Sequence, residues 1–213
     1  MIPADLFENG READLGAGAV LLVGFARPVA ATLLDEVRRV VAAAPFRCMV
    51  TPGGFRMSVA MTNCGSAGWI TDRKGYRYDA IDPESGLPWP PLPAAFAELA
   101  ARAAQAAGFG DFAPDACLIN RYAPGARMSR HQDRNERSLD QPIVSISLGL
   151  PAKFLFGGTQ RGDRARRVSL FHGDVVVWGG AARLNFHGVA PLAEGSHPIT
   201  GRERINLTLR QAL

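Results

Sequence analysis

Short segments of alternating apolar and polar residues dominate the second half of the chain, and all but the last are closed by glycine or proline. Alternation with a period of two predicts β-strands with one buried face, and the glycines and prolines predict the turns between them. Several such strands in succession favour a β-sandwich or jelly roll. From residue 115 onward the segments are ACLINRYAPGA, PIVSISLGLP, KFLFGG, RVSLFHGDVVVWGG and RINLTLRQAL.

The first half of the chain has a different character. Its apolar stretch GAVLLVGF predicts a strand, and apolar residues at helical spacing predict a helix over 32–41. Residues 45–92 are rich in glycine, proline and aromatic residues, a composition that predicts short strands and loops forming a lid. An alanine-rich amphipathic helix is predicted over 93–108. We expect one structural domain with a strand–helix extension over 1–44, this lid, and a β-core over 93–213.

The composition is that of an ordinary globular protein. Of the 213 residues, 47% are hydrophobic and 21% are charged, which is unlike a disordered chain. At ~150 residues per domain, this length suits one large domain. The three cysteines, Cys48, Cys64 and Cys117, are widely spaced and form no CxxC motif, which argues against a disulfide scaffold and for a reducing compartment.

Charge and hydropathy narrow the class of partner. No apolar run approaches the ~20 residues that span a bilayer, and the N-terminus lacks the pattern of a secretory signal. We therefore expect a cytoplasmic protein without membrane association, and a monomer because no coiled-coil seam is present. Lysine and arginine number 24 against 20 acidic residues, a net charge of +4 that weakly favours a polyanionic partner.

The most informative histidines are His131, which forms an HxD pair with Asp133, and His187, which follows the VVVWGG segment. Residues two apart in an extended chain point to the same side, so the pair can face one point. Two imidazoles and one carboxylate on one face of a metal make the facial triad of non-haem Fe(II) oxygenases. An HxD pair is also common in loops without metal, and the same ligands suit a zinc hydrolase.

The C-terminal segment alternates without a break, with Ile205, Leu207 and Leu209 on one face. A strand with one solvated face would show this pattern. A barrel strand whose polar face lines a pocket would show it too, and its two arginines would then suit a dicarboxylate. The polar face carries Arg204, Asn206, Thr208 and Arg210, and Leu118, Asn120 and Tyr122 alternate similarly on an earlier predicted strand.

Together these segments resemble the AlkB group of Fe(II)- and 2-oxoglutarate-dependent dioxygenases, over most of the chain. The resemblance implies an α+β, mainly β fold: a double-stranded β-helix (jelly roll) with flanking helices, under a nucleotide-recognition lid. It also implies oxidative removal of N-alkyl groups from DNA or RNA bases. The blocks that carry it are MVTPGGFRMSVAMTNCG (49–65), GWITDRKGY (68–76), DACLINRYAPGA (115–126), HQDRNE (131–136), PIVSISLGLPAKFLFGG (142–158), HGDVVVWGG (172–180) and RINLTLRQA (204–212).

The resemblance also assigns residues to cofactors. Fe(II) would be held by His131, Asp133 and His187, with 2-oxoglutarate as cosubstrate and O₂ as oxidant. The products would be succinate, CO₂, formaldehyde and the repaired base. The cosubstrate pocket would be formed by Leu118, Asn120, Tyr122, Arg204, Asn206 and Arg210, with Arg204 on the far carboxylate.

For the lid, the resemblance implies a base stacked on Trp69 and Tyr76, with His131 as the opposing wall. Without the resemblance, the two aromatic residues are simply expected to pack a small lid core. Thr51 and Met61 match lid positions near the nucleotide, and Arg161 matches a basic position that suits phosphate. The further arginines of that predicted hairpin also suit a solvated face.

One position departs from the family pattern. HQDRNE carries Asn135 where an acidic residue is expected, which keeps a carbonyl acceptor but removes the charge. This predicts weaker discrimination in favour of cationic lesions such as 1-methyladenine and 3-methylcytosine.

The leading hypothesis is a DNA-repair dioxygenase acting on single-stranded DNA, with double-stranded DNA and RNA left open. A first rival is an oxygenase of the same chemistry that acts on RNA or a small molecule. A second is a metal-bearing barrel that binds nucleic acid without catalysis, although such a binder has no need of a buried strand with two arginines.

Overall fold

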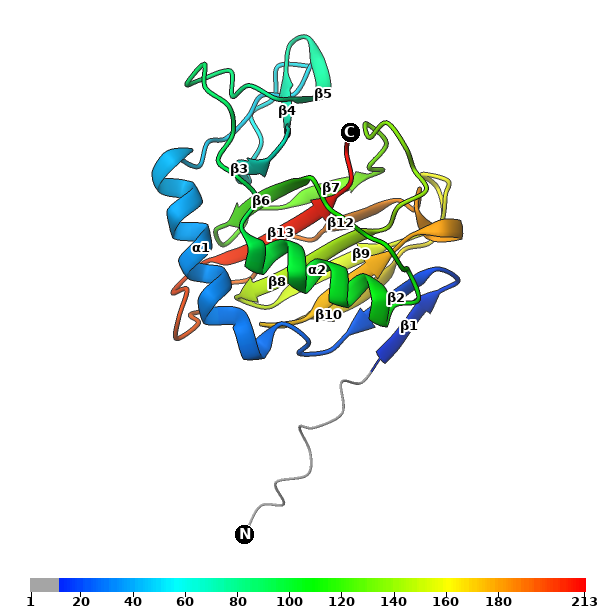
Figure 1. Cartoon of the computed structure of the whole chain (residues 1–213). Helices are drawn as coiled ribbons and strands as arrows, with labels where there is room; N and C mark the ends of the chain where they lie inside the picture. The colour runs from blue at the N-terminus through cyan, green and yellow to red at the C-terminus, as the bar shows by residue number, and fades with distance from the viewer. Residues whose placement is uncertain (1–11) are drawn as a thin grey trace.

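The computed structural model describes residues 12–213, and two antiparallel sheets form its core (Figure 1). The larger sheet has seven strands and the smaller has four. In sheet order, the larger contains β1 (Glu12–Gly16), β2 (Ala19–Leu22), β11 (Val175–Trp178), β8 (Ile143–Gly149), β13 (Arg204–Arg210), β6 (Ala116–Tyr122) and β3 (Ala60–Gly65). The smaller contains β10 (Arg166–Leu170), β9 (Ala152–Phe156), β12 (His187–Val189) and β7 (Met128–His131).

The two sheets face each other and enclose an apolar cluster that includes Leu21, Phe154, Phe156, Val176 and Trp178. This is the sandwich predicted from the alternating segments. Strand β13 is an interior strand of the larger sheet, where it pairs with β8 on one side and β6 on the other. The polar face of β13 is buried as well as its apolar face. The structure therefore agrees with the interpretation in which this strand lines a pocket, and not with the one in which its polar face is solvated.

Two helices cover the outer face of the larger sheet, α1 (Ala30–Ala43) and α2 (Ala94–Ala106) (Figure 1). Both were predicted, over 32–41 and 93–108. The buried stripe of α1 includes Leu33 and Val37, and that of α2 includes Phe96 and Leu99. These side chains form a second apolar cluster with the outward-facing residues of the sheet, such as Leu207. The 3-10 helices η2 (Arg27–Val29) and η3 (Gly180–Ala182) are short connections.

A separate hairpin of β4 (Gly68–Asp72) and β5 (Gly75–Asp79) projects beyond one end of the two larger sheets (Figure 1). It lies within the predicted lid. Strands β1, β2 and β3, however, complete the larger sheet although they lie outside 93–213. The segment forming β3 has five of six residues buried because it pairs with β6 along its whole length. The core sheet therefore includes strands from outside the range 93–213 that was predicted to form it. Only part of the predicted lid, 45–92, lies outside this sheet.

His172 and His197 lie near a turn at the edge of the sandwich, with their rings stacked at a centroid distance of 4.5 Å. The backbone N–H of Gly149 donates to Nδ1 of His172 at 3.0 Å. Partial burial, followed by the positive charges of His197 and Arg27, lowers the pKa of His172 below its ordinary value of 6.5. Within residues 12–213, no helix has both the length and the hydrophobicity required to cross a membrane.

We expect the contribution of His172 to stability to fall as the pH drops through 6.5. Its pKa is lowered in the folded state, so the unfolded chain takes up the proton first and acid favours unfolding. The free energy of unfolding, measured with urea at pH 7.5 and 5.5 after metal removal, should fall less in His172→Gln than in the wild type. An equal loss of stability in both proteins would contradict this assignment.

Candidate active site

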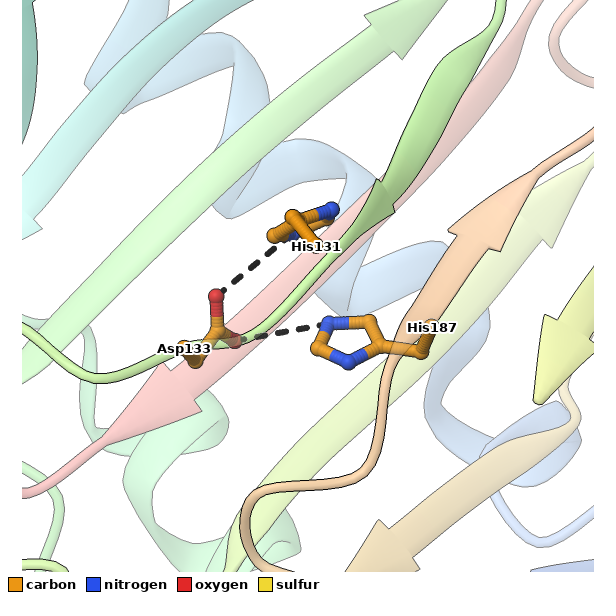
Figure 2. Close-up of side chains that lie close together, drawn as sticks. All are labelled: His131, Asp133 and His187. Carbon is orange, nitrogen blue, oxygen red and sulfur yellow. Dashed lines mark ion pairs between the residues drawn. The ribbon is translucent and has the colours of Figure 1, made fainter. Parts of the chain in front are cut away.

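The two predicted histidine ligands meet because β7 and β12 are neighbours in the smaller sheet. His131 ends β7, His187 begins β12, and the two residues are directly opposite in the antiparallel register. Asp133 follows β7 by two residues and turns its carboxylate between the two rings (Figure 2). Its Oδ1 lies 3.5 Å from Nε2 of His131, and its Oδ2 lies 3.6 Å from Nε2 of His187. One ligand atom from each residue lies within 4.8 Å of the others.

Backbone carbonyls orient both imidazole rings. Nδ1 of His131 lies 2.9 Å from the carbonyl oxygen of Ser129, and Nδ1 of His187 lies 3.0 Å from that of Asn185. A carbonyl can only accept, so each Nδ1 carries the proton and donates it. Both Nε2 atoms then present lone pairs toward the carboxylate, which is how a second hydrogen bond fixes the tautomer of a metal-binding histidine.

The electrostatics keep two of the three ligands in the metal-binding protonation state. Burial, and then the neighbouring His131, lower the pKa of His187 to about 4. Burial alone would raise the pKa of Asp133, but the Arg210 guanidinium and the two imidazoles outweigh it and hold that pKa well below its usual range. At neutral pH the site therefore offers a neutral imidazole and an ionised carboxylate, as metal coordination requires.

A cavity of about 50 Å³ adjoins the two histidines, and all six predicted cosubstrate residues line it. A cavity of ~10–15 Å³ is enough to hold one water, so this larger cavity has room for a small molecule. The six are Leu118, Asn120, Tyr122, Arg204, Asn206 and Arg210. Sequence reasoning missed other lining residues, among them Met128, Ser145, Phe154, Trp178 and Val189. Most of these are apolar, and nothing in the sequence distinguishes them from other core residues.

Arg204 gives the strongest sign that an anion belongs in this cavity. The residue is 1% exposed, and its guanidinium lies over the Tyr122 ring at 5.0 Å. Its Nη2 donates to Oγ of Ser147 at 2.9 Å, but Nε and Nη1 have no hydrogen-bond partner within residues 12–213. A buried guanidinium with two free donors is costly. A carboxylate in the cavity would accept a charge-assisted hydrogen bond from this guanidinium.

Asn206 and Arg210 lie on the same face of β13 as Arg204, and both hydrogen-bond to other protein groups. The Asn206 amide donates to Oγ of Ser145 at 2.8 Å and to the carbonyl of Ile146 at 2.9 Å. Arg210 donates to Oδ2 of Asp133 from Nη2 at 2.6 Å and from Nε at 3.1 Å. Arg210 thus binds a predicted metal ligand directly as well as lining the cavity.

The predicted base-binding residues divide into a surface group and a buried residue. Trp69 and Tyr76 stack on each other with ring centroids 5.7 Å apart, and Nε1 of Trp69 donates to Oδ1 of Asn135 at 3.3 Å. Asn135 is exposed, and Tyr76 is 48% exposed. Met61, by contrast, is completely buried in the cluster between the sheets, among residues that include Leu118.

Two further predicted contacts lie on loops. Thr51 opens a tight turn, where its Oγ1 accepts from the backbone N–H of Phe55 at 3.2 Å. Arg161 is exposed, with its guanidinium 4.9 Å from the centre of the Phe186 ring, and it donates to the carbonyl of Arg130 at 3.2 Å.

Two residues absent from the sequence predictions, Arg183 and Glu136, brace the loop that carries Asp133. Arg183 is 4% exposed, and its Nη1 donates to the carbonyl oxygen of Asp133 at 2.7 Å. Its Nη2 lies 3.2 Å from Oε2 of Glu136. Glu136 stands inside the HQDRNE block, but its burial depends on long-range packing that the sequence does not display.

Comparisons with known proteins agree with this geometry. A family model described as the 2OG-Fe(II) oxygenase superfamily matches residues 18–210. The alpha-ketoglutarate-dependent dioxygenase AlkB of Escherichia coli (strain K12) is 57% identical over 210 residues, which cover 98% of this chain and 97% of that protein. The chain belongs to the AlkB family of alpha-ketoglutarate-dependent dioxygenases.

Two other comparisons extend the AlkB match. An AlkB homolog of Caulobacter vibrioides (strain NA1000 / CB15N) is 48% identical over 170 residues, or 79% of this chain and 76% of that protein. The solved structure of OsALKBH1 is similar with a TM-score of 0.85, at 28% identity, and covers 94% of this chain and all of its own. The predictions of an AlkB-family jelly roll and of an Fe(II)- and 2-oxoglutarate-dependent dioxygenase are confirmed.

We expect His131→Ala and Asp133→Ala to abolish Mn(II) binding and 2-oxoglutarate turnover, because each removes one of only three protein ligands. Calorimetry with Mn(II) measures the first effect and succinate formation the second, with circular dichroism to confirm folding. Asp140→Ala, which removes an exposed carboxylate from the same loop, is the matched control. Metal binding by a folded His131→Ala or Asp133→Ala protein at wild-type affinity would refute the ligand assignment.

Arg204→Met should raise the KM for 2-oxoglutarate by about 10–100-fold and leave Mn(II) affinity unchanged. Each charge-assisted hydrogen bond is worth ~1.5–3 kcal/mol, and 1.4 kcal/mol corresponds to tenfold. Arg121→Met is the control, since Arg121 is half-exposed on the same sheet and faces Phe46 outside the cavity. A KM within twofold of the wild type would show that Arg204 is not the cosubstrate anchor.

Proposed function

We propose that this protein removes N-alkyl groups from nucleic-acid bases by oxidation, as a direct-reversal repair enzyme. The observation that carries the proposal is the ligand set of His131, Asp133 and His187, which opens onto the cavity containing the unsatisfied donors of Arg204. Dioxygenase chemistry follows from family membership. The choice of a nucleic-acid substrate is supported by the stacked pair of half-buried Trp69 and exposed Tyr76, since Trp69 bonds to Asn135 in the loop that carries Asp133.

In the proposed mechanism the triad holds Fe(II), which with 2-oxoglutarate and O₂ supplies the power to hydroxylate the alkyl carbon attached to a base nitrogen. Arg204 anchors the far carboxylate of the cosubstrate. Asn120, Tyr122 and Asn206 shape the pocket together with Leu118 and Arg210. The products would be formaldehyde, succinate, CO₂ and the repaired base. The surrounding apolar side chains exclude water from the reacting carbon.

The proposed base site lies between the lid and the metal centre. Trp69 and Tyr76 supply stacking surface, and His131 lies on the opposite side of the base. Asn135 and Thr51 present polar groups to the base edge and backbone, Arg161 contacts phosphate, and Met61 belongs to the buried cluster against which Trp69 packs. The hairpin β4–β5 is the part of the proposed lid (45–92) that covers the base, while the proposed extension (1–44) and core (93–213) both contribute strands to the larger sheet.

Single-stranded DNA is the proposed substrate, because a base must leave the duplex to reach a buried centre and an unpaired base needs the least energy to do so. We further propose a monomer located in the cytoplasm. Relatives named tRNA demethylase, in Schizosaccharomyces pombe, and nucleic acid dioxygenase, in Homo sapiens, make an RNA substrate the first alternative to test.

The test is a mass measurement on a single-stranded DNA oligonucleotide that carries one 3-methylcytosine. Protein purified without oxygen is incubated with Fe(II), 2-oxoglutarate, ascorbate and air, alongside reactions that lack one component. Loss of one methyl mass that depends on both iron and 2-oxoglutarate is the expected result. Succinate formation without demethylation of DNA or of the matching RNA would contradict the proposed substrate.

Asn135→Asp should increase the rate on cationic 1-methyladenine and 3-methylcytosine relative to neutral N-alkyl lesions. The wild-type amide offers an acceptor without charge, whereas a carboxylate attracts a positively charged base. Relative kcat/KM values on paired oligonucleotides measure the effect, with Asn135→Ser as a control that also lacks charge. The proposed role is wrong if the ratio of cationic to neutral rates is the same in wild type and Asn135→Asp.

A further inference from the structure

A buried polar path joins the lid hairpin to the metal centre and begins at Tyr78 on β5. The Tyr78 hydroxyl donates to Oε1 of Glu136 at 2.9 Å. Glu136 is only 8% exposed and lies three residues after Asp133, in the loop that follows β7. Burial raises the pKa of Tyr78 well above its ordinary value, so the phenol is protonated and acts as the donor. One end of the path is therefore a lid strand and the other is the ligand loop.

Arg210 continues this path from Glu136 to the side chain of Asp133. Nε of Arg210 lies 3.3 Å from Oε1 of Glu136, the same oxygen that accepts from Tyr78. Nη2 of Arg210 donates to Oδ2 of Asp133 at 2.6 Å. That Oδ2 is the oxygen facing His187. A shift of the Glu136 carboxylate would therefore change how Arg210 holds a ligand oxygen.

Arg183 provides a second branch from Glu136 to the backbone of Asp133. It faces Oε2 of Glu136 at 3.2 Å and donates to the Asp133 carbonyl at 2.7 Å. Two carboxylates and two guanidiniums thus share one buried network. Such a network favours one arrangement, because every displaced member leaves a charge unpaired in a low dielectric.

The lid hairpin needs contacts of this kind. A two-stranded sheet is marginally stable by itself, so β4 and β5 are seated by what they touch on the core. The Asn63 side-chain amide donates to the carbonyl of Trp69 and accepts from its backbone N–H. The Trp69 indole N–H donates to Oδ1 of Asn135. Among these described lid contacts, the bond from Tyr78 is the one that leads to Arg210 and Asp133.

We propose that Tyr78 is a positioning residue that couples the seating of the lid hairpin to the orientation of Asp133, acting through Glu136 and Arg210. The proposal rests on the metal-binding role of Asp133 proposed above. A lid seated over a substrate holds Glu136 and Arg210 in place and aligns Asp133 for the metal. By reciprocity, a metal bound to Asp133 favours the seated lid by the same factor.

Hydrogen exchange of the lid amides tests this coupling without turnover. Exchange is measured in the full chain after metal removal, and again with Mn(II) and 2-oxoglutarate. In the wild type, loading should slow exchange over β5 by ~5-fold or more, the lower end of typical coupling factors. In Tyr78→Phe the slowing over β5 should disappear, while that over β7 and β13 persists.

Mn(II) affinity separates coupling from mere loosening of the lid. If Tyr78 acts on Asp133, Tyr78→Phe binds Mn(II) more weakly than the wild type by about the factor lost in lid protection. Glu136→Gln, which keeps an acceptor for Tyr78 but loses the charge facing Arg210, should show the same weakening. Thr71→Val is the matched control, since it removes a buried lid hydroxyl that donates to the carbonyl of Val50 at 3.3 Å.

Each outcome decides the proposal. Wild-type Mn(II) affinity in Tyr78→Phe, or undiminished slowing over β5, would overturn the coupling while leaving the metal centre intact. Equal effects in Thr71→Val would also overturn it, because any loss of lid stability would then suffice. Failure of the wild type to bind Mn(II) would refute the proposed metal centre itself, and the coupling with it.

Discussion

The buried ion pair between Asp133 and Arg210 is the interaction on which the site depends most. Asp133 stands on a loop with no regular hydrogen bonding, yet its side chain is only 10% exposed. An isolated carboxylate in such a place would lose its solvation, and removing one partner of a buried pair typically costs ~3–5 kcal/mol. The bond to Arg210 offsets that loss and fixes where the carboxylate points. Arg210 in turn is fixed because it ends β13, an interior strand of the larger sheet.

Strand β13 organises the rest of the site through its two faces. Its apolar residues Ile205, Leu207 and Leu209 pack toward the helices, and its polar residues point between the sheets. Pairing with β8 and β6 supplies the partners of that polar face, including Ser147 for Arg204 and Ser145 for Asn206. On the polar face of β13, Asn206, Thr208 and Arg210 are thus held by protein partners, whereas Nε and Nη1 of Arg204 have none within residues 12–213. Those donors remain where a dicarboxylate would lie.

Much of this follows from local sequence pattern. Helical spacing of apolar residues located both helices, and alternation located the strands of the sandwich, because those periods report directly on which side is buried. The HxD pair and the alternating arginines identified the metal and cosubstrate candidates. His131 and His187 face each other because of the register of β12 against β7. The two residues are 56 positions apart in the chain, and this separation does not determine the register.

The features that the sequence did not reveal are those created by long-range packing. The range expected to form the lid contains β3, whose pairing with β6 draws it into the core, and Met61 is buried with it. The network of Glu136, Arg183 and Tyr78 joins three separate segments of the chain, and no local pattern distinguishes its members from surface residues. Its presence means that the ligand loop and the lid are parts of one electrostatic unit.

The most direct measurement is a crystal structure with Mn(II) and 2-oxoglutarate, with the metal located by its anomalous scattering. One metal peak is expected between Nε2 of His131, Nε2 of His187 and the Asp133 carboxylate, with the far carboxylate of the cosubstrate hydrogen-bonded to the Arg204 guanidinium. A metal bound to other residues, or a cosubstrate carboxylate that makes no hydrogen bond to Arg204, would contradict this description of the site.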